Sequence, residues 1–332
     1  MKCVVTGGAG FIGSHLTDKL LKEGHKVTII DDFSTGREKN LHEAVNNSNL
    51  VDIKKINIVD IGIRPLFKEI DWVFHLAGKA DIVPSIERPA DYYNTNVTGT
   101  LNILEACRSY GVKKLAYASS SSLYGNKARV PTKEAYKPNP KYPYALTKYM
   151  GEQLVTHYGQ VYRLPVVSLR LFNVYGPRSR TSGAYGAVMG VFLAQKANEM
   201  PFTRVGNGEQ GRDFTYVSDV VDAFIVAAKS PVTCEVINIG FGYPWTINAL
   251  IYELGGLDAK IVQIPKRPGE PNTTQADISK ARKLLAWSPL VPLQLGIKSL
   301  LEHLEDWKDA PVWTPGKIEE ATKTWFDYLG RR

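Results

Sequence analysis

Apolar and polar residues follow two recurring patterns along the first 172 positions. Short apolar runs, such as KCVVT at 2–6, are typical of buried strands, whereas apolar residues at every third or fourth position are typical of helices. Further strands are predicted at 26–31, 50–58, 71–77, 113–119 and 166–172. Helices are predicted from Phe11 to Gly24, over 91–110 and over 143–158. Strands that alternate with helices indicate an α/β fold with a parallel, doubly wound sheet.

The pattern loosens after about residue 173, where loops rich in glycine and proline separate short helical segments. This composition indicates a second, smaller lobe. The stretches SDVVDAFIVAAK and EVINIG, within about 213–240, keep the helix and strand rhythm and are expected to return to the first lobe. We therefore predict a first domain over 1–172 and a second lobe mainly over 173–332. The sequence does not identify a partner for the last predicted helix, IEEATKTWFDYL.

Composition is that of an ordinary globular protein, with 44% hydrophobic and 10% aromatic residues among 332. No apolar stretch approaches the ~18 residues that cross a bilayer, and the N-terminus lacks the apolar run of a signal peptide. Cys3, Cys107 and Cys234 are scattered, without the spacing of a zinc or redox site. We expect a cytoplasmic protein without disulfides or a bound metal.

The formal charge of +8 permits nucleic acid, a membrane surface or a small anion as partner. Lys and Arg are spread along the chain, and the densest clusters, such as RSR at 178–180, are too small to follow a nucleic-acid backbone. An anionic metabolite is therefore favoured over nucleic acid or a membrane. A basic surface that only keeps the protein soluble explains the charge almost as well.

The segment between the first strand and the first helix has the composition of a dinucleotide site. Gly7, Gly10 and Gly13 form a GxxGxxG turn, and such a turn brings backbone N–H groups and the positive helix end to a pyrophosphate. A purely structural glycine turn is the alternative. Asp31 ends the second strand, where a carboxylate accepts from both ribose hydroxyls of NAD and repels a 2′-phosphate. The pattern therefore predicts NAD and disfavours NADP.

Tyr144 and Lys148 lie four positions apart in KYPYALTKY, so they share one face of a helix. The spacing alone does not identify a catalytic pair, because Tyr110 and Lys114 have it too, across Gly111. These two residues could equally be ordinary members of a solvated helix. The rest of the chain has to decide between the two interpretations.

Nine landmarks occur in the order found in one family. They are TGGAGFIG at 6–13, Asp31, HLAG at 75–78, NVTGTLNILEA at 96–106, ASSSSLYG at 118–125, YALTK at 144–148, LRLFNVYGP at 169–177, GRDFTYVSD at 211–219 and RPGEP at 267–271. The chain resembles the extended short-chain dehydrogenase/reductases, and within them the NAD-dependent nucleotide-sugar epimerases of UDP-glucose 4-epimerase type. The match covers almost the whole chain and is weakest after about residue 305.

The resemblance implies a Rossmann-like first domain, a UDP-sugar substrate and a homodimer formed through the helices at 91–110 and 143–158. It implies that Tyr144 is the base that takes the proton of the sugar 4-hydroxyl while NAD accepts the C4 hydride. The 4-keto sugar then rotates, and the hydride returns to its other face. Lys148 and the nicotinamide would lower the pKa of the Tyr144 phenol. Ser120 would bond the reacting sugar oxygen; counting back from Tyr124 leaves Ser119 as the alternative.

Further contacts follow from the same resemblance. The implied cofactor contacts are Gly7, Gly10, Phe11, Ile12, Gly13, Asp31, Asp32, Asp60, Ile61, Leu76, Ala77, Asn96, Tyr144 and Lys148. The implied substrate contacts are Ser120, Ser121, Ser122, Asn173, Ala187, Val188, Arg212, Arg267, Glu270 and Thr274. Asp32 and Asp60 could instead be solvated surface carboxylates. Lys79 stands one position before the cofactor-contacting lysine of the family and is expected to be exposed.

The substrate lobe carries the implied specificity. Arg212 and Arg267 would clamp the diphosphate, Glu270 would contact the nucleotide ribose and Asn173 the sugar, although each arginine could instead form a surface ion pair. Thr274 leaves room where enzymes restricted to glucose and galactose carry Tyr. Together with RTSGAYGAV at 180–188, it favours a UDP-hexose or an N-acetylhexosamine. UDP-glucuronate remains the alternative.

Other activities of the same fold need residues that differ here. The 4,6-dehydratases carry an Asp-Glu pair where Ser121 and Ser122 stand, and the nucleotide-sugar decarboxylases carry a glutamate in the same loop. Neutral serines cannot carry out that proton transfer, so epimerisation is favoured over dehydration, decarboxylation or reduction. A dinucleotide-binding sensor without catalysis is the non-enzymatic alternative. Such proteins typically lose the catalytic residues, and this chain keeps Ser120, Tyr144 and Lys148.

Overall fold

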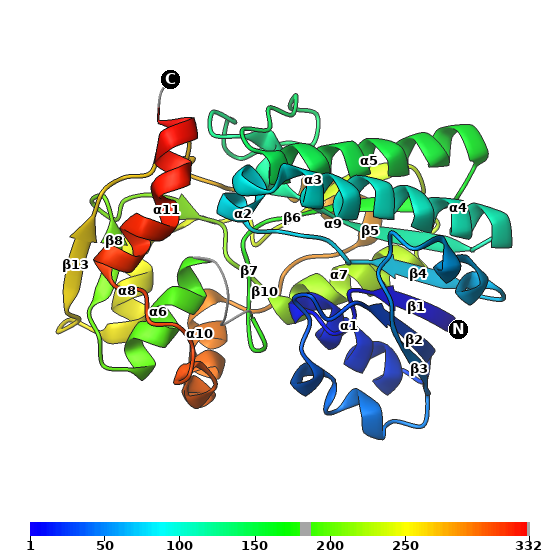
Figure 1. Cartoon of the computed structure of the whole chain (residues 1–332), viewed down its shortest axis with the longest axis horizontal. Coiled ribbons are helices and arrows are strands. Elements are labelled where there is room, and N and C mark those ends of the chain that lie inside the picture. The colour runs from blue at the N-terminus through cyan, green and yellow to red at the C-terminus, as the bar shows by residue number, and fades with distance from the viewer. Residues whose placement is uncertain (180–186, 331–332) are drawn as a thin grey trace.

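A parallel sheet of seven strands forms the centre of the first part of the molecule, with strand order β11-β6-β5-β4-β1-β2-β3 (Figure 1). The computed structural model describes residues 1–179 and 187–330. The strands of the sheet are β1 (Lys2–Thr6), β2 (Lys26–Asp31), β3 (Leu50–Lys55), β4 (Trp72–His75), β5 (Lys114–Ser120), β6 (Val166–Leu171) and β11 (Glu235–Ile239). The predicted doubly wound α/β fold is confirmed.

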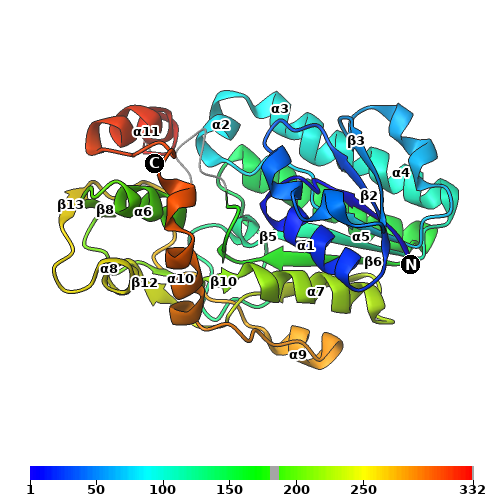
Figure 2. The same cartoon turned by 90° about the horizontal axis from the view of Figure 1, so that it is seen from below.

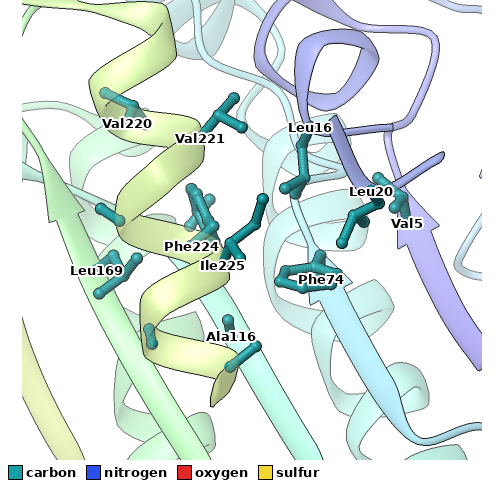
Figure 3. Close-up of a cluster of buried hydrophobic side chains, with 14 of the residues drawn as sticks. Val5, Leu16, Leu20, Phe74, Ala116, Leu169, Val220, Val221, Phe224 and Ile225 are labelled. Carbon is teal, nitrogen blue, oxygen red and sulfur yellow. The ribbon is translucent and has the colours of Figure 1, made fainter. Parts of the chain in front are cut away.

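Helices cover both faces of this sheet. One face carries α1 (Phe11–Lys22) and α7 (Val217–Lys229), and the other carries α3 (Pro89–Tyr93), α4 (Thr100–Tyr110) and α5 (Pro143–Tyr162). Figure 3 shows the first interface, where Phe224 and Ile225 of α7 point toward Leu16 of α1 and toward Phe74 and Ala116 of the strands. These side chains are almost fully buried, so burial of apolar surface holds the two layers together.

Some predicted boundaries differ from those in the structure. Strand β3 ends at Lys55 instead of residue 58, because the Ile56 N–H donates to the Asp31 and Lys54 carbonyl oxygens and the chain leaves the sheet. The predicted helix over 91–110 contains a π-helical turn, Asn94–Gly99, between α3 and α4. Such turns often lie at functional positions.

The second part of the molecule has its own apolar core. Its elements are α6 (Val188–Ala197), β8 (Phe202–Val205), α8 (Ile247–Gly255), β13 (Ile261–Ile264) and α10 (Leu293–Glu302). Parallel pairing of β8 with β13 forms a small sheet, and residues of α6, α8 and α10 share one hydrophobic cluster. Short pairs join β7 (Val174–Tyr175) to β10 (Thr215–Tyr216) and β9 (Gly211–Arg212) to β12 (Trp245–Thr246).

Several later segments lie against the first part. Strand β11 pairs with β6, α7 packs on α1, and α9 (Ser279–Leu285) contacts β11. The last helix, α11 (Pro315–Leu329), contacts α2 (Ile82–Glu87), and both views draw the two helices side by side (Figure 2). The structure thus supplies the partner that the sequence did not identify. Across residues 1–179 and 187–330, no helix combines the length and the apolar content needed to span a membrane.

Candidate functional site

A cavity of about 420 Å³ lies at the carboxyl ends of the central strands. Ligands of doubly wound sheets bind at this edge, and the volume falls in the range of cofactor sites. The lining includes the predicted cofactor residues Gly7, Gly10, Phe11, Ile12, Gly13, Asp31, Asp32, Leu76 and Ala77. From the second part it includes Ala187, Met189, Gly190, Val191, Ala194, Pro311 and Trp313. The cavity therefore lies between the sheet and helix α6.

The glycine turn is shaped for close approach. Gly7 has a φ of +72°, and a Cβ there would lie 2.7 Å from the Ala77 nitrogen. A Cβ on Gly13 would overlap the Gly7 carbonyl oxygen. Helix α1 begins next to this turn with no side-chain cap, so the positive helix end faces the cavity without a competing carboxylate from its own first turn. The turn fits a pyrophosphate.

Asp31 is positioned as a ribose acceptor. Its buried carboxylate accepts from the Ala9 N–H at 2.9 Å and the Phe33 N–H at 2.8 Å, and burial raises its pKa. Each carboxylate oxygen has a second lone pair for a hydroxyl donor. Asp32 also lines the cavity and accepts from Ser34 and from the Asn57 side chain. Two neighbouring carboxylates would repel a 2′-phosphate, so the site fits NAD better than NADP.

Five predicted cofactor residues are not among those that line the cavity: Asp60, Ile61, Asn96, Tyr144 and Lys148. Asp60 accepts from the Gly62 N–H at 2.7 Å and caps the short helix Ile61–Phe67, and the Ile61 side chain is exposed. The cavity wall is formed instead by Ile56, Asn57 and Ile58. The cause is the early end of β3, because the residues that follow a strand directly are the ones that reach this edge. Ile56, Asn57 and Ile58 could have been identified from the sequence only if the end of β3 at Lys55 had been predicted correctly.

Asn96 supports the cavity wall from behind. Its amide accepts from the Lys79 N–H at 2.9 Å and donates to the Lys79 carbonyl at 3.0 Å and to the Thr147 hydroxyl at 3.0 Å. It thereby joins the loop after β4 to helix α5. Lys79, which we expected to be exposed, is half-buried and lines the cavity, since this pairing holds its backbone there.

The predicted catalytic hydroxyls meet at the end of β5. The Tyr144 hydroxyl donates to Ser120 Oγ at 3.2 Å, and Ser120 Oγ lies 2.9 Å from Ser122 Oγ. Ser119 points away, because neighbouring strand residues face opposite sides, and it donates to Glu152 at 2.6 Å. The geometry therefore favours Ser120 over Ser119 as the residue that faces Tyr144.

Lys148 lies one helical turn after Tyr144 and is buried. Its Nζ lies 4.4 Å from the centre of the Tyr117 ring and 3.7 Å from where a Cβ on Gly78, a cavity residue, would lie. Burial lowers the Lys148 pKa to about 7, although the Glu152 carboxylate raises it. The ammonium therefore stands next to the cavity and gains or loses its proton near neutral pH.

The pKa of Tyr144 departs from the expected direction. Burial raises the Tyr144 pKa, and the hydrogen bond to Ser120 and the nearby Ser122 hydroxyl lower it only in part. Within the described parts of the chain, no hydrogen bond joins the Tyr144 hydroxyl to Lys148. Burial of the phenol thus raises the Tyr144 pKa in the chain alone, whereas the sequence led us to expect that Lys148 and the nicotinamide together lower it.

A buried ion pair behind these residues was not predicted. Arg170 of β6 donates to Glu152 of α5 at 2.6 and 2.9 Å, and its third contact is the Tyr124 hydroxyl at 2.7 Å. Glu152 lies one turn after Lys148, on the helix that carries the site. An arginine in the middle of the apolar run 166–172 was the available signal, since a charge inside a buried strand needs a partner.

The predicted diphosphate residues form one cluster. Arg267 donates to Glu270 at 3.0 Å, and Arg212 lies 3.9 Å from the other Glu270 oxygen. Arg212 also donates to the carbonyl oxygens of Gly211 at 2.8 Å and Pro271 at 3.0 Å. Two guanidinium groups and one carboxylate leave a net positive charge, which suits a phosphate group.

Thr274 and Asn173 are also brought together. The Thr274 hydroxyl donates to Asn173 Oδ1 at 3.2 Å and accepts from the Asp213 N–H at 3.2 Å. Ala187 lines the cavity, and Val188 is the first residue of α6. Ser121 begins a short 3₁₀ helix after Ser120 and is half-buried. Residues 180–186 of the stretch RTSGAYGAV lie outside the described residues.

Tyr142 is a site residue that sequence reasoning missed. Its ring lies parallel to that of Tyr144, with centres 6.3 Å apart and an angle of 14° between the planes. Burial raises the Tyr142 pKa, which also responds to the Ser122 hydroxyl and to the charges of Arg212 and Glu270. Tyr142 therefore links the cluster of hydroxyl groups to the arginine cluster. The sequence feature that could have indicated its role is its position, two residues before Tyr144.

Within residues 1–179 and 187–330, no three His, Cys, Asp or Glu side chains are grouped as a metal site requires. Cys3 and Cys107 are buried and Cys234 is partly buried, and all three are free thiols. Burial raises the pKa of the Cys3 thiol to about 12, so this group is unreactive at neutral pH.

Known proteins resemble the chain over nearly its whole length. The UDP-glucose 4-epimerase of Mycolicibacterium smegmatis is 36% identical over 92% of this chain and 99% of its own. The solved UDP-N-acetylglucosamine 4-epimerase of Methanobrevibacter ruminantium has a TM-score of 0.85 and 35% identity, covering 91% of this chain and 98% of that one. The UDP-glucuronic acid 4-epimerase of Bacillus cereus, solved with UDP-glucuronic acid and NAD, has a TM-score of 0.85 and 34% identity, covering 92% and 99%.

Residues 3–240 match the profile of the NAD dependent epimerase/dehydratase family. The match begins at β1 and ends just after β11, so it spans the whole central sheet and the glycine turn. The resemblance drawn from the nine landmarks is confirmed, and so is NAD as the cofactor. The chain is an enzyme that belongs to the NAD dependent epimerase/dehydratase family.

Proposed function

We propose that this enzyme inverts C4 of a UDP-sugar by transient oxidation. The proposal is carried by the 3.2 Å hydrogen bond between the Tyr144 hydroxyl and Ser120, at the end of β5 and beside a buried Lys148. A phenol and a serine hydroxyl that share a proton can take it from a sugar hydroxyl and return it. The relatives and solved structures described above are 4-epimerases, which supports the same reaction here.

The residues of the cavity would hold NAD. Gly7, Gly10 and Gly13 would face its pyrophosphate, and Asp31 and Asp32 its adenosine ribose. When bound, NAD supplies an oxidised nicotinamide that takes up and later returns the electrons and hydrogen of C4, and its positive charge favours the Tyr144 phenolate. The chain itself supplies the base, the orientation and the exclusion of water.

Tyr144 acts as the base in this proposal. Ser120 bonds the reacting sugar hydroxyl and relays its proton to the Tyr144 phenolate, which becomes the neutral phenol, and Ser122 keeps the Ser120 hydroxyl in place at 2.9 Å. Lys148 stands beside the cavity with a pKa of about 7, so it can donate or accept a proton in neutral solution. The same residues restore the proton after the sugar has presented its other face.

The second part of the molecule would bind the rest of the substrate. Arg212 and Arg267 would hold the diphosphate, Glu270 the nucleotide ribose, and Asn173 with Thr274 the sugar. A small side chain at Thr274 supports a UDP-hexose or a UDP-N-acetylhexosamine. UDP-glucuronic acid is the other candidate, since the Bacillus cereus enzyme acts on it. The neutral Ser121 and Ser122 argue against dehydration and decarboxylation.

We also propose a cytoplasmic homodimer. Exposed apolar side chains lie on the helices that cover one face of the sheet, with Leu101 of α4 at 39% and Leu146 of α5 at 46% exposure. A two-fold axis beside these helices would bury both residues in a four-helix contact. The free thiols support a reducing compartment. Light scattering of the purified enzyme, with Leu101→Glu as the disrupting variant, measures the assembly.

The test uses UDP-glucose, UDP-N-acetylglucosamine and UDP-glucuronate, each incubated with the purified enzyme. Proton NMR at C4 should report the epimer of at least one, and mass spectrometry should find its mass unchanged. Tyr144→Phe should retain NAD and lose at least about a hundredfold in turnover, the range for loss of a general base. Loss of water or carbon dioxide, or near wild-type turnover of Tyr144→Phe, would overturn the proposal.

A further inference from the structure

The C-terminal helix α11 joins the two parts of the molecule beside the arginine cluster. At its start, Ile318 packs with Val205 and Ile264, so it is anchored on the small sheet of β8 and β13. Farther along, the Thr324 hydroxyl donates to Glu87 of α2 at 3.2 Å. Figures 1 and 2 both draw α11 extending from the β8–β13 sheet toward α2. One helix thus contacts both sides of the site.

Trp325 of α11 contacts the loop that carries Arg267 and Glu270. Its side chain is 4% exposed, and its indole N–H donates to the Pro268 carbonyl at 2.7 Å. The Arg267 guanidinium lies 5.7 Å from the centre of the same ring. Gly269 follows with a φ of +75°, and a Cβ on it would lie 4.0 Å from Leu329. The loop that carries Arg267 and Glu270 is therefore held by α11.

These contacts fix the direction of a charged side chain. An arginine loses much rotamer freedom when it binds a phosphate, and a guanidinium already stacked on an aromatic ring has lost part of it beforehand. The ring also attracts the cation, so Arg267 has a partner besides Glu270. Without the indole, Glu270 would compete more strongly for Arg267.

We propose, on the basis of the proposed function, that α11 completes the nucleotide-sugar site and that Trp325 is a positioning residue for Arg267 at the diphosphate. The indole holds the guanidinium through its face and the loop through its N–H. The ligand class is a nucleoside diphosphate, because two arginines converge where one carboxylate already balances part of their charge. The contact between Thr324 and Glu87 keeps this helix against α2, which follows the cavity residues Lys79, Ala80 and Asp81.

The test measures the affinity of the NAD-loaded enzyme for UDP and for UMP by calorimetry. Trp325→Ala should weaken UDP binding about tenfold, the size expected for loss of a cation–π contact and one hydrogen bond. UMP has one phosphate fewer and should lose less. Trp325→Phe keeps an aromatic face without the N–H and should fall between wild type and Trp325→Ala. Tyr328→Ala is the matched control, because that aromatic side chain on α11 is 69% exposed.

Steady-state kinetics separate positioning from general structural damage. Trp325→Ala should raise the KM for the UDP-sugar by a similar factor and leave kcat and NAD content near wild type. Equal UDP affinity in wild type and Trp325→Ala would overturn the inference, and so would an equal loss in Tyr328→Ala or Trp325→Phe. If the wild-type enzyme itself fails to bind UDP, the proposed function fails, and this inference fails with it.

Discussion

Glu152 and Arg170 form a bidentate ion pair between α5 and β6, with side chains 0% and 6% exposed. Glu152→Gln would leave the guanidinium charge buried beside a neutral amide. We expect a loss of about 3 kcal/mol in the free energy of unfolding, the range for a broken buried pair. Urea denaturation measures it. Glu69→Gln, which breaks an exposed pair with Lys2, is the control and should cost less than about 1 kcal/mol. An equal loss of unfolding free energy in the two variants would show that burial does not make the Glu152–Arg170 pair more important than an exposed pair.

Lys148 should make stability depend on pH in a predictable direction. Its pKa falls from 10.5 to about 7 on folding, so between these values the unfolded chain binds more protons than the folded one. The free energy of unfolding therefore rises with pH across this window, by roughly 1.4 kcal/mol for each pH unit. Below about pH 7, the folded protein carries the full cost of a buried ammonium.

Lys148→Met removes that cost. Compared without NAD, the variant should exceed the wild type in stability most at pH 6, and the difference should shrink by pH 9. Urea denaturation at several pH values measures the difference in unfolding free energy between variant and wild type. The contributions of the other titrating groups are the same in both proteins and cancel in this difference. The same variant should lose most turnover. A stability difference that stays constant from pH 6 to 9 would show that Lys148 keeps its ordinary pKa.

Tyr142→Phe tests whether the Tyr142 hydroxyl acts on the neighbouring hydroxyl groups of Ser122, Ser120 and Tyr144. The ring stack on Tyr144 remains, and only a hydroxyl is removed. We expect kcat to fall by up to about tenfold, the upper limit for a polar interaction between neutral groups, with KM little changed. Tyr162→Phe, at the exposed end of α5, should behave as wild type. A change in KM alone would mean that Tyr142 serves binding.

Thr274→Tyr tests the space beside the sugar. The Thr274 hydroxyl lies 3.2 Å from Asn173 Oδ1, so a larger side chain would enter the region that Asn173 faces. Activity on an N-acetylhexosamine should fall at least about tenfold more than activity on a hexose, as expected when a pocket loses the volume for a substituent. Competition between the two substrates measures the ratio. Asn272→Tyr, at an exposed position of the same loop, is the control, and an unchanged ratio in Thr274→Tyr would exclude the residue as a size gate.

Most of the sheet could be predicted because each strand is a short apolar run that local pattern identifies. The choice between Ser119 and Ser120 could not be predicted, since four serines follow one another and counting residues does not show which side chain faces Tyr144. The structure separates them through strand alternation, with Ser119 bonded to Glu152 and Ser120 to Tyr144. Partners far apart in sequence were also hidden, such as Trp325 on Arg267. Pairings of this kind depend on how the whole chain packs.

The pKa of Tyr144 shows a different limit. Spacing placed a lysine one turn away, but spacing carries no information on burial, which raises the phenol pKa here. Asp60 shows that the sequence pattern also does not fix where a strand ends. The early end of β3, at Lys55, moves the cavity wall from Asp60 to Ile56, Asn57 and Ile58.

The edge strand β11 has a consequence for how this protein can be divided. It and α7 are encoded after Asn173, yet one pairs with β6 and the other covers Phe74 and Leu16. A polypeptide ending at residue 172 would leave an unpaired strand edge and a bare apolar sheet face, which favours aggregation. Nucleotide-sugar preference therefore cannot be exchanged between such enzymes by swapping contiguous halves, and a chimera would have to carry residues 215–239 with the recipient sheet.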